Sequence, residues 1–283
     1  MRLLVTCWRH RRGEGALLLV EDGRVVERIA HPVPLMGLER RAIDGPETWG
    51  WVVDHTGRLY RVARGPALAD GIDLRDDHER DGELGTHDLV ARGSSLVAVA
   101  TGTEELRIHE PGVAGVARLA LTDLGADVHH INGCVPFGAS HVLVTAFACP
   151  GEGTSWRAIE GASGVVALVA IGETTPALIL HADQFWPHSP RMIRGVLWWC
   201  DTRRGLVRSA LGHAIRVPGL ARGLRLLSDG RLAVGLSVDR HDPRATDAWG
   251  VALVDPSGIS GRVEFWTWGQ DPLEVYDVLE VNG

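Results

Sequence analysis

The strongest constraint on the fold of this sequence is a short phrase that recurs six times. Each copy is followed by a turn containing Gly or Asp and then by an apolar stretch, as Ser94 precedes Leu96 to Ala100. The copies begin at Met36, His87, His130, His188, Arg222 and Tyr276. Dividing the 283 residues by six gives about 47 residues for each unit, and repeats of this length are typical of blades with four strands.

Apolar segments of about four to eight residues alternate with Gly, Pro and Asp along the chain. Examples are Ala16 to Glu21, Ser95 to Ala100, Val142 to Phe147 and Leu232 to Ser237. Such segments indicate strands, and no long window has the i, i+3, i+4, i+7 spacing of an amphipathic helix. We therefore expect an all-β fold, a six-bladed β-propeller. An all-β sandwich is the alternative, and the six-fold recurrence counts against it.

The sixth phrase lies too close to the C-terminus to open a blade of its own. Three N-terminal segments have strand character but no opening phrase: Leu3 to Trp8, Ala16 to Glu21 and Val25 to Ile29. We therefore expect Val275 to Val281 to form the inner strand of a blade whose outer strands come from residues 1–31. This arrangement closes the ring and removes open sheet edges, so that residues 1–283 form a single propeller domain.

Composition excludes several classes of function. The net charge is −7 and the basic residues are scattered, so no nucleic-acid partner is expected. All 29 basic side chains are Arg, since no Lys occurs, which removes Schiff-base and lysine general-base chemistry. The four cysteines have no paired spacing and are expected to be buried thiols. Nothing resembles a signal-peptide core or a membrane span, so we expect a cytoplasmic protein without a membrane partner.

Three consecutive units carry a histidine at the matched position of the phrase. The innermost strand of each blade follows the central channel, so His87, His130 and His188 are expected at one channel mouth. Three imidazoles from separate strands can bind a divalent transition metal and leave positions for water and substrate. We therefore predict a site for Fe, Zn, Mn or Cu. Structural, hydrogen-bonded histidines are the alternative.

The next two units supply polar residues to the other side of the mouth. Arg222 is expected to anchor a carboxylate or phosphate, or to pair with Glu274 across the channel. Tyr276 is expected to act as an acid or to form a hydrogen bond. These three residues are the predicted catalytic groups.

Histidines that bind a metal usually donate their second ring nitrogen to a carboxylate or carbonyl. For this orienting role we expect Asp88, Asn132 and Asp277, which flank the mouth. His129 is adjacent to His130 and should point to the other face of its strand, so its role is orienting or structural.

Taken together, the phrases resemble a family of uncharacterised six-bladed propeller proteins, a domain of unknown function. Its members share His-Asp-Leu, His-Leu-Asn-Gly, Pro-His-Ser-Pro-Arg, Arg-Gly-Leu, Val-Gly-Leu-Ser and Glu-Ile-Tyr-Asp-Val, in this order. The counterparts here begin at His87, His130, Pro187, Arg222, Val234 and Glu274. The likeness spans about residues 35–282 and departs at Thr101 to Glu104, where the family has Asn-Thr-Arg-Phe-Ser-Cys. The resemblance implies the fold and the position of the site, and it brings no known reaction with it.

The sequence therefore predicts a metal-dependent enzyme that acts on a small polar or anionic substrate at one mouth of the channel. Zinc or manganese would favour a lyase, hydrolase or isomerase, whereas iron or copper would favour oxygenase chemistry. A non-catalytic ligand-binding or protein-interaction propeller is the alternative from another class.

Overall fold

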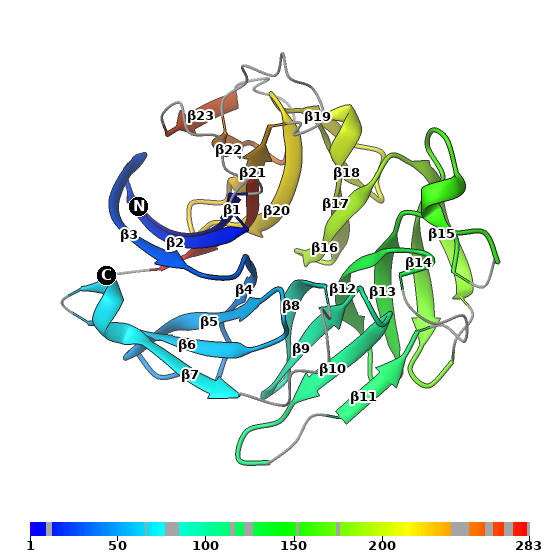
Figure 1. The fold of residues 1–283 in the computed structure, drawn as a ribbon. Helices are drawn as coiled ribbons and strands as arrows, with labels where there is room; N and C mark the ends of the chain where they lie inside the picture. Colours follow the sequence, from blue (N-terminus) through cyan, green and yellow to red (C-terminus); the bar gives the residue numbers. More distant parts are fainter. Residues whose placement is uncertain are drawn as a thin grey trace.

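In the residues that the computed structural model describes, six four-stranded antiparallel sheets surround a common axis (Figure 1). The described residues are 1–9, 13–65, 67–76, 85–113, 117–121, 127–150, 153–173, 176–238, 249–257, 263–268 and 274–281. Each sheet is one blade, with an inner strand at the axis and an outer strand at the rim. The predicted six-bladed β-propeller is confirmed.

The first three blades are given from the inner to the outer strand. Blade 1 consists of β24 (Glu274–Glu280), β1 (Arg2–Arg9), β2 (Glu14–Glu21) and β3 (Arg24–His31). Blade 2 consists of β4 (Leu35–Glu39), β5 (Thr48–Asp54), β6 (Leu59–Ala63) and β7 (Ile72–Asp76). Blade 3 consists of β8 (Thr86–Arg92), β9 (Ser95–Ala100), β10 (Glu105–His109) and β11 (Ala117–Ala120).

The remaining blades follow the same order. Blade 4 consists of β12 (Ile131–Phe137), β13 (His141–Ala146), β14 (Gly164–Ala170) and β15 (Pro176–Gln184). Blade 5 consists of β16 (Pro187–Ile193), β17 (Val196–Asp201), β18 (Leu206–Ser209) and β19 (Ala214–Arg216). Blade 6 consists of β20 (Leu220–Leu226), β21 (Leu232–Ser237), β22 (Gly250–Val254) and β23 (Val263–Thr267).

Helical structure in the described residues is limited to short 3₁₀ turns. They are η2 (Leu68–Gly71), η3 (Trp156–Ala158) and η4 (Thr202–Arg204). None of the helices described here has the length and apolar character needed to cross a membrane.

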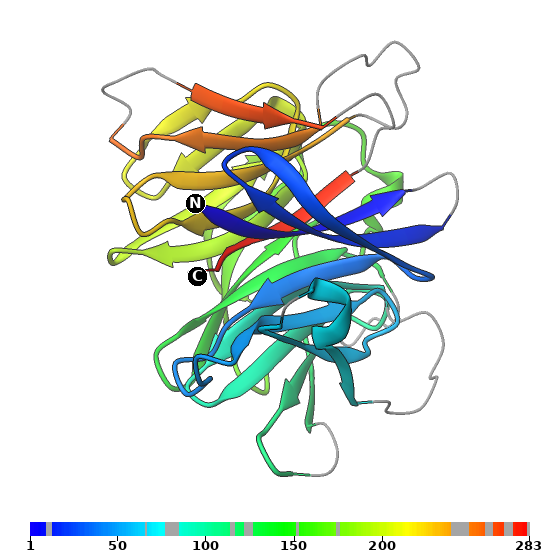
Figure 2. The same cartoon turned by 90° about the vertical axis from the view of Figure 1, so that its left-hand side faces the viewer.

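Blade 1 combines strands from both ends of the sequence, as predicted. The inner strand β24 pairs antiparallel with β1, with Val5 opposite Val278. Figure 2 shows the red C-terminal strand alongside the blue N-terminal strands. The hydroxyl of Thr6 donates a hydrogen bond to the backbone carbonyl of Met36 and so ties blade 1 to blade 2. The last inner strand is thereby built into the ring by main-chain pairing.

The opening phrase of each unit coincides with a register shift in the pairing of the inner strand. The shifts lie at Leu35/Leu38, Thr86/Asp88, Ile131/Gly133, His188/Arg191, Arg222/Leu224 and, on the β1 side of the β1–β24 pair, Thr6/Cys7. A bulge inserts an extra residue, bends the strand and changes the direction of nearby side chains. Six bulges at matched positions therefore direct residues of the phrases toward the same end of the channel.

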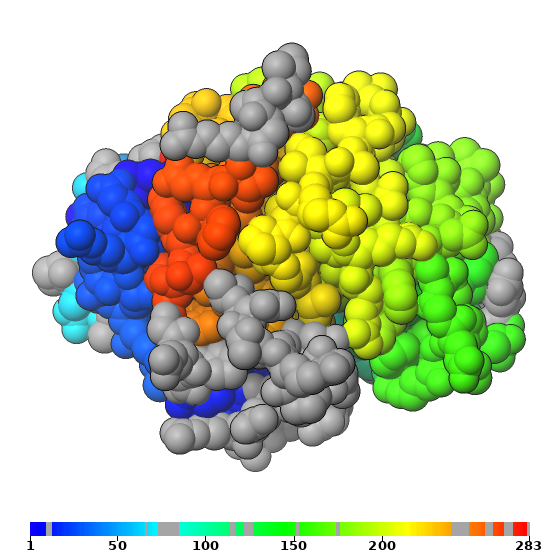
Figure 3. Space-filling model, turned by 90° about the horizontal axis from the view of Figure 1, so that it is seen from above, coloured from blue at the N-terminus to red at the C-terminus, as the bar shows by residue number. Residues whose placement is uncertain are grey.

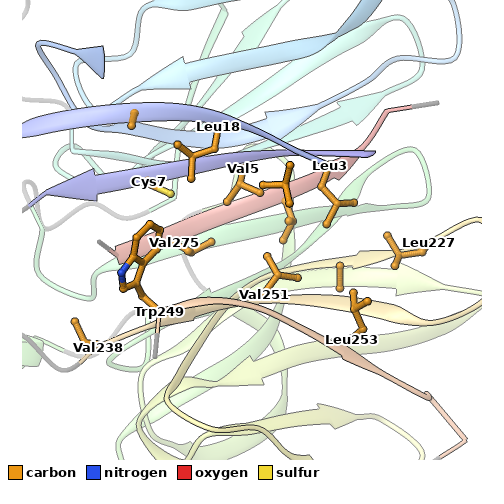
Figure 4. Close-up of a cluster of buried hydrophobic side chains, with 14 residues drawn as sticks. Leu3, Val5, Cys7, Leu18, Leu227, Val238, Trp249, Val251, Leu253 and Val275 are labelled. Atoms are coloured by element: carbon orange, nitrogen blue, oxygen red, sulfur yellow. The ribbon is translucent and has the colours of Figure 1, made fainter. Parts of the chain in front are cut away.

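Apolar side chains on facing surfaces of neighbouring blades form the core. The cluster in Figure 4 joins blade 1 to blade 6 and includes Leu3, Val5, Cys7, Leu18, Val275, Trp249, Val251 and Leu253. At the rim, the Trp268 indole N–H donates to the Gly23 carbonyl at 3.0 Å. This contact joins the orange and blue segments that lie side by side in Figure 3. The blades are thus packed from the core to the rim.

A buried ion network crosses the channel. Arg191 of β16 donates to both carboxylate oxygens of Asp88 in β8, at 2.9 and 2.8 Å, and lies 3.4 Å from Asp277 of β24. Arg225 of β20 donates to Asp277 at 3.3 Å and to Glu39 of β4 at 2.9 Å. Blade 5 is not adjacent to blade 3 or to blade 1, so these bonds must pass across the axis. We call these five side chains the channel network.

Candidate functional site

A cavity of about 570 Å³ lies at the channel mouth where the opening phrases meet. The three predicted histidines His87, His130 and His188 line it, together with Arg222 and Tyr276. These residues come from β8, the turn before β12, β16, β20 and β24, so five blades contribute to one site. We call this cavity the mouth pocket.

His188 is held in one orientation by its neighbours. Its Nδ1 atom lies 2.9 Å from the Trp186 carbonyl oxygen and 2.9 Å from the Thr202 hydroxyl. The carbonyl can only accept, and the Thr202 hydroxyl already donates to the Ala221 carbonyl at 2.7 Å, so Nδ1 carries the hydrogen. In the neutral ring, Nε2 is therefore the nitrogen with the lone pair.

His130 is paired with a carboxylate. Its Nδ1 lies 2.7 Å from Oδ1 of Asp127, and Arg157 holds Asp127 in turn by donating to its backbone carbonyl at 3.1 Å and to its carboxylate. Burial raises the pKa of Asp127, but the hydrogen bonds and charges of His130 and Arg157 bring it below its ordinary value. An ionised carboxylate on Nδ1 orients the ring and makes Nε2 more basic.

His87 has bonding capacity that the described residues leave unused. Its Nδ1 atom is buried and has no hydrogen-bond partner among them. The His130 ring lies 5.0 Å away between centroids, with an angle of 87° between the planes, and the His55 ring lies 6.1 Å away. Buried polar atoms almost always have a partner.

Burial lowers the pKa of all three predicted histidines. The pKa of His87 and that of His188 lie well below 6.5, with the charge of Arg222 adding to the effect of burial. Burial also lowers the pKa of His130, but Asp127 opposes this shift. The mouth pocket therefore presents neutral imidazoles, which can accept a proton, accept a hydrogen bond or bind a metal.

Arg222 makes the ion pair expected from the sequence and also lines the mouth pocket. Its Nη1 donates to Glu274 at 2.7 Å, and its guanidinium carbon lies 4.9 Å from the centre of the Tyr276 ring. The Tyr276 hydroxyl donates to the same Glu274 carboxylate at 3.2 Å. The Nε atom of Arg222 is buried without a hydrogen-bond partner among the described residues. Arg222 thus lines the cavity while Glu274 holds it in place.

The residues expected to orient the histidines have other partners. Asp88 and Asp277 belong to the channel network, and the Asn132 side chain accepts from Thr145 at 2.9 Å and donates to the His130 carbonyl at 3.3 Å. The bonds of Asp88 to Arg191 direct it into the channel network, whereas His87 lines the mouth pocket. The orienting groups in the structure are Asp127, the Trp186 carbonyl and Thr202.

Three residues of the mouth pocket have the left-handed backbone conformation. The φ angles are 50° for Asp127, 54° for His130 and 58° for Trp186. This conformation is unfavourable for residues other than glycine, most of all for bulky ones, and it persists where the surroundings impose it. The buried carboxylate of Glu104 contributes by accepting from the backbone N–H of His130 at 2.9 Å. Strain of this kind is concentrated at functional sites.

His129 lies on the other side of the strand opening, as its position suggests. Its ring Nδ1 lies 2.9 Å from Oε2 of Glu104, and both side chains are fully buried. Glu104 belongs to the loop where this chain departs from the family phrase, and the same loop supplies Thr101 and Gly102 to the wall of the mouth pocket. The loop at Thr101 to Glu104 therefore contributes to the site although its residues differ from those of the family phrase.

Sequence reasoning missed the aromatic wall of the mouth pocket and a fourth imidazole. The missed lining residues are Trp8, His55, Asp127, Phe147, Trp156, Arg157 and Trp186. Asp127 and Trp186 lie within three residues of a phrase histidine, which is a signal that could have found them. Trp8 and His55 are far from any phrase in the sequence and reach the pocket only through the fold.

The described residues do not form a ready-made metal site. No group of three or more His, Cys, Asp or Glu side chains among them is placed to hold a metal ion. Neutral imidazoles suit a transition metal chemically, but the donor atoms of His87, His130 and His188 do not converge on one point in these side-chain positions.

Comparison with known proteins supports the fold. No protein-family model and no curated protein sequence matches this chain. Among solved structures, a nidogen–laminin complex has a TM-score of 0.63 at 12% identity, over 98% of this chain and 97% of the other. A Bacteroides caccae protein of unknown function has a TM-score of 0.63 at 11% sequence identity, over 100% of this chain and 99% of the other. A protein provisionally named a gluconolactonase has a TM-score of 0.53 at 15% sequence identity, over 87% of this chain and 90% of the other. At these identities the likeness shows the propeller fold alone.

Proposed function

We propose that the mouth pocket is the active site of an enzyme that transfers a proton on a small anionic substrate, with His130 as the general base. The single observation that carries this proposal is the Asp127–His130 pair inside the cavity, with 2.7 Å between Oδ1 and Nδ1. A carboxylate on Nδ1 leaves Nε2 as the basic nitrogen and stabilises the imidazolium that forms when it takes a proton.

The other groups have complementary roles in this proposal. Arg222 anchors the acidic group of the substrate through donors that Glu274 does not use. His87 is a neutral imidazole with an unpartnered nitrogen, so it can donate a hydrogen bond to an oxygen on which negative charge develops. His188, with its tautomer set by the backbone, accepts a hydrogen bond through Nε2. Two imidazoles with different surroundings thereby serve as base and as hydrogen-bond donor.

Two reaction classes use this arrangement. His130 can remove a proton from the carbon next to the anchored acid, as in a lyase or isomerase, or it can activate water, as in a hydrolase. The protein named as a gluconolactonase shares the fold, which makes lactones sensible test substrates without assigning that activity.

The test is turnover of a panel of hydroxy acids, esters and lactones that carry a carboxylate. We expect His130→Gln to lower kcat by about 100-fold or more on any substrate that is turned over. His141→Gln is the matched control, because His141 begins β13 and is not part of the described pocket lining. Equal kcat for His130→Gln and the wild type would overturn the proposed role of the base.

A metal-dependent enzyme is the second candidate. The observation that favours it is the set of neutral imidazoles, one with an unpartnered nitrogen. Iron, zinc, manganese or copper would supply Lewis-acid or redox chemistry to the substrate, and the three rings would have to turn to bind the ion. Elemental analysis of the purified protein tests this directly. A stoichiometric metal lost in His130→Ala and His188→Ala supports it, and a metal content unchanged by these substitutions contradicts it.

The same panel of hydroxy acids, esters and lactones distinguishes an enzyme from a non-catalytic ligand-binding propeller. If the wild type binds members of the panel with an affinity that depends on Arg222 but turns over none of them, the mouth pocket is a ligand-binding site rather than an active site.

A further inference from the structure

The side chains that line the mouth pocket have an unusual composition. Nine of the 15 described lining residues carry flat rings: Trp8, His55, His87, His130, Phe147, Trp156, Trp186, His188 and Tyr276. The other six are Gly85, Thr101, Gly102, Asp127, Arg157 and Arg222, so this described lining contains no Leu, Ile, Val or Met. Aliphatic and aromatic side chains both line most ligand pockets. A lining made of rings restricts the shape and the chemistry of what it can hold.

The tryptophan rings are held from their faces by other groups. The Phe147 ring is stacked on Trp186 with an interplanar angle of 13°, and the Arg203 guanidinium lies over the same indole at 4.2 Å from its centre. The Arg157 guanidinium lies over Trp156 at 4.6 Å. These contacts occupy part of the faces of the two rings, and we therefore assign the ligand contact to their edges. Ring edges carry partial positive charge and prefer the electron-rich face of another aromatic ring.

Two other ligand classes fit less well. A cationic ligand, which aromatic cages often bind, would meet the charges of Arg157 and Arg222. A polyhydroxylated ligand needs donors and acceptors for most of its hydroxyl groups. Apart from the imidazoles, the two arginines and Tyr276, the described lining supplies few. The Thr101 hydroxyl already donates to the Ile131 carbonyl at 2.7 Å, Asp127 is bound to His130 and Arg157, and the described lining contains no Asn, Gln or Ser.

We infer that the mouth pocket takes an aromatic carboxylate, with the acid on Arg222 and the flat ring against the edges of the Trp156 and Trp186 indoles. The cavity of about 570 Å³ is in the size range of sites for small organic ligands. This inference rests on the proposed function, because it also uses Arg222 to bind the acid. It adds that the rest of the substrate is an aromatic ring.

The test compares four probes by isothermal titration calorimetry with the wild-type protein. Benzoate has a flat ring and an acid, cyclohexanecarboxylate replaces the flat ring by a puckered one, gluconate is a polyhydroxylated acid, and benzyl alcohol lacks the charge. We expect benzoate to bind about tenfold more tightly than each of the others, because only benzoate satisfies both the ring edges and Arg222. Affinity of cyclohexanecarboxylate or gluconate equal to that of benzoate would overturn the inference.

Substitution of one indole locates the ring subsite. We expect Trp156→Leu to remove the preference for benzoate over cyclohexanecarboxylate and Trp156→Phe to retain most of it. Trp51→Leu is the matched control, since the Trp51 ring also has an arginine, Arg41, 4.6 Å from its centre but is not part of the described pocket lining. Circular dichroism shows whether each variant is folded. An unchanged preference in folded Trp156→Leu would overturn the placement of the ring.

The anchor variant separates the two proposals. If Arg222→Gln weakens every carboxylate probe while benzoate and gluconate bind the wild type equally, the aromatic class is wrong and the anionic site stands. If Arg222→Gln changes the affinity of none of the acids, both proposals lose their anchor. Arg231→Gln is the control, because Arg231 forms its ion pairs with Asp229 and Glu264 on the exposed surface.

Discussion

The mouth pocket and the channel network are built from adjacent residues of the same inner strands, yet the side chains of the first line a cavity and those of the second bind one another. His87 in the mouth pocket has a buried nitrogen without a partner among the described residues. The next residue, Asp88, accepts from Arg191 through both carboxylate oxygens. The bulge between Thr86 and Asp88 interrupts the regular pairing at this point, so that one residue lines the cavity and the next binds across the axis.

This difference separates groups that hold the fold together from groups that are available for chemistry. Both regions are buried, polar and assembled from several blades, so neither burial nor residue type distinguishes them. In the channel network two arginines bind three carboxylates across the axis. In the mouth pocket the imidazoles and Arg222 retain donors and acceptors. Buried nitrogens without a described partner occur in both regions, among them Nε of Arg191 and Nε of Arg225. Access to the cavity is therefore the better indicator of function in this molecule.

The largest expected effect comes from breaking the channel network. Arg191→Met would leave the Asp88 and Asp277 carboxylates buried with fewer partners, and loss of one member of a buried ion pair costs about 3–5 kcal/mol. We expect the free energy of unfolding, measured by urea denaturation, to fall by this amount. Arg231→Met, which removes an exposed ion pair, should change it by no more than about 1 kcal/mol. Equal effects of the two substitutions would contradict the distinction drawn here.

The mouth pocket should instead control how stability depends on pH. The fold lowers the pKa of His87 and His188 well below 6.5, chiefly through burial, so below pH 6.5 the unfolded chain binds protons that the native protein does not. The contribution of His87 and His188 to the free energy of unfolding should therefore be constant above pH 6.5. It should decrease as the pH falls below this value. Each unit of lowered pKa corresponds to about 1.4 kcal/mol.

Thermal unfolding between pH 7.5 and 5 measures this dependence. The decline in Tm toward low pH should be smaller in His188→Gln, which removes one of the histidines whose pKa the fold lowers most. A decline that is the same in His188→Gln as in the wild type would show that other groups cause it.

Tyr276 tests the boundary between the two regions, because its neighbour Asp277 belongs to the channel network. Tyr276→Phe removes the hydrogen bond to Glu274 at 3.2 Å and should lower the free energy of unfolding by about 0.5–1.5 kcal/mol. A loss as large as that for Arg191→Met would indicate that the Arg222–Glu274–Tyr276 group is part of the structural network.

Asp127→Asn should have the smallest effect on stability of the four substitutions. Asp127 opposes the effect of burial on the pKa of His130, so removal of its charge should lower the pKa of His130 further. Titration of ¹³C-labelled histidine by NMR measures this shift. A rise in the pKa of His130 in the variant would mean that Asp127 does not support its basicity.

Much of the fold could be predicted from the sequence because its signals are local. Each blade begins with a phrase that forms a bulge in the inner strand, and each bulge needs only a few neighbouring residues. The closing blade was predictable for the same reason, since β24 carries a phrase and β1 to β3 do not. The matched position of the phrases also predicted that His87, His130 and His188 would line one cavity.

The bonding partners of these residues could not be predicted in this way. Asp88 and Arg191 are 103 positions apart and meet only because their strands face each other across the axis. The same holds for Trp8 and His55, which come from segments without any phrase. Asp127 is close to His130 in sequence, but only the left-handed turn, held by Glu104 from the neighbouring blade, directs its carboxylate to the ring.

The sequence by itself determined the number of blades, the way the ring closes and that the three histidines share one end of the channel, because periodic local signals are sufficient for these features. The tertiary structure alone decided which polar groups neutralise each other and which remain available to a ligand. That division depends on distances across the ring between residues far apart in the chain, and no local pattern encodes such distances.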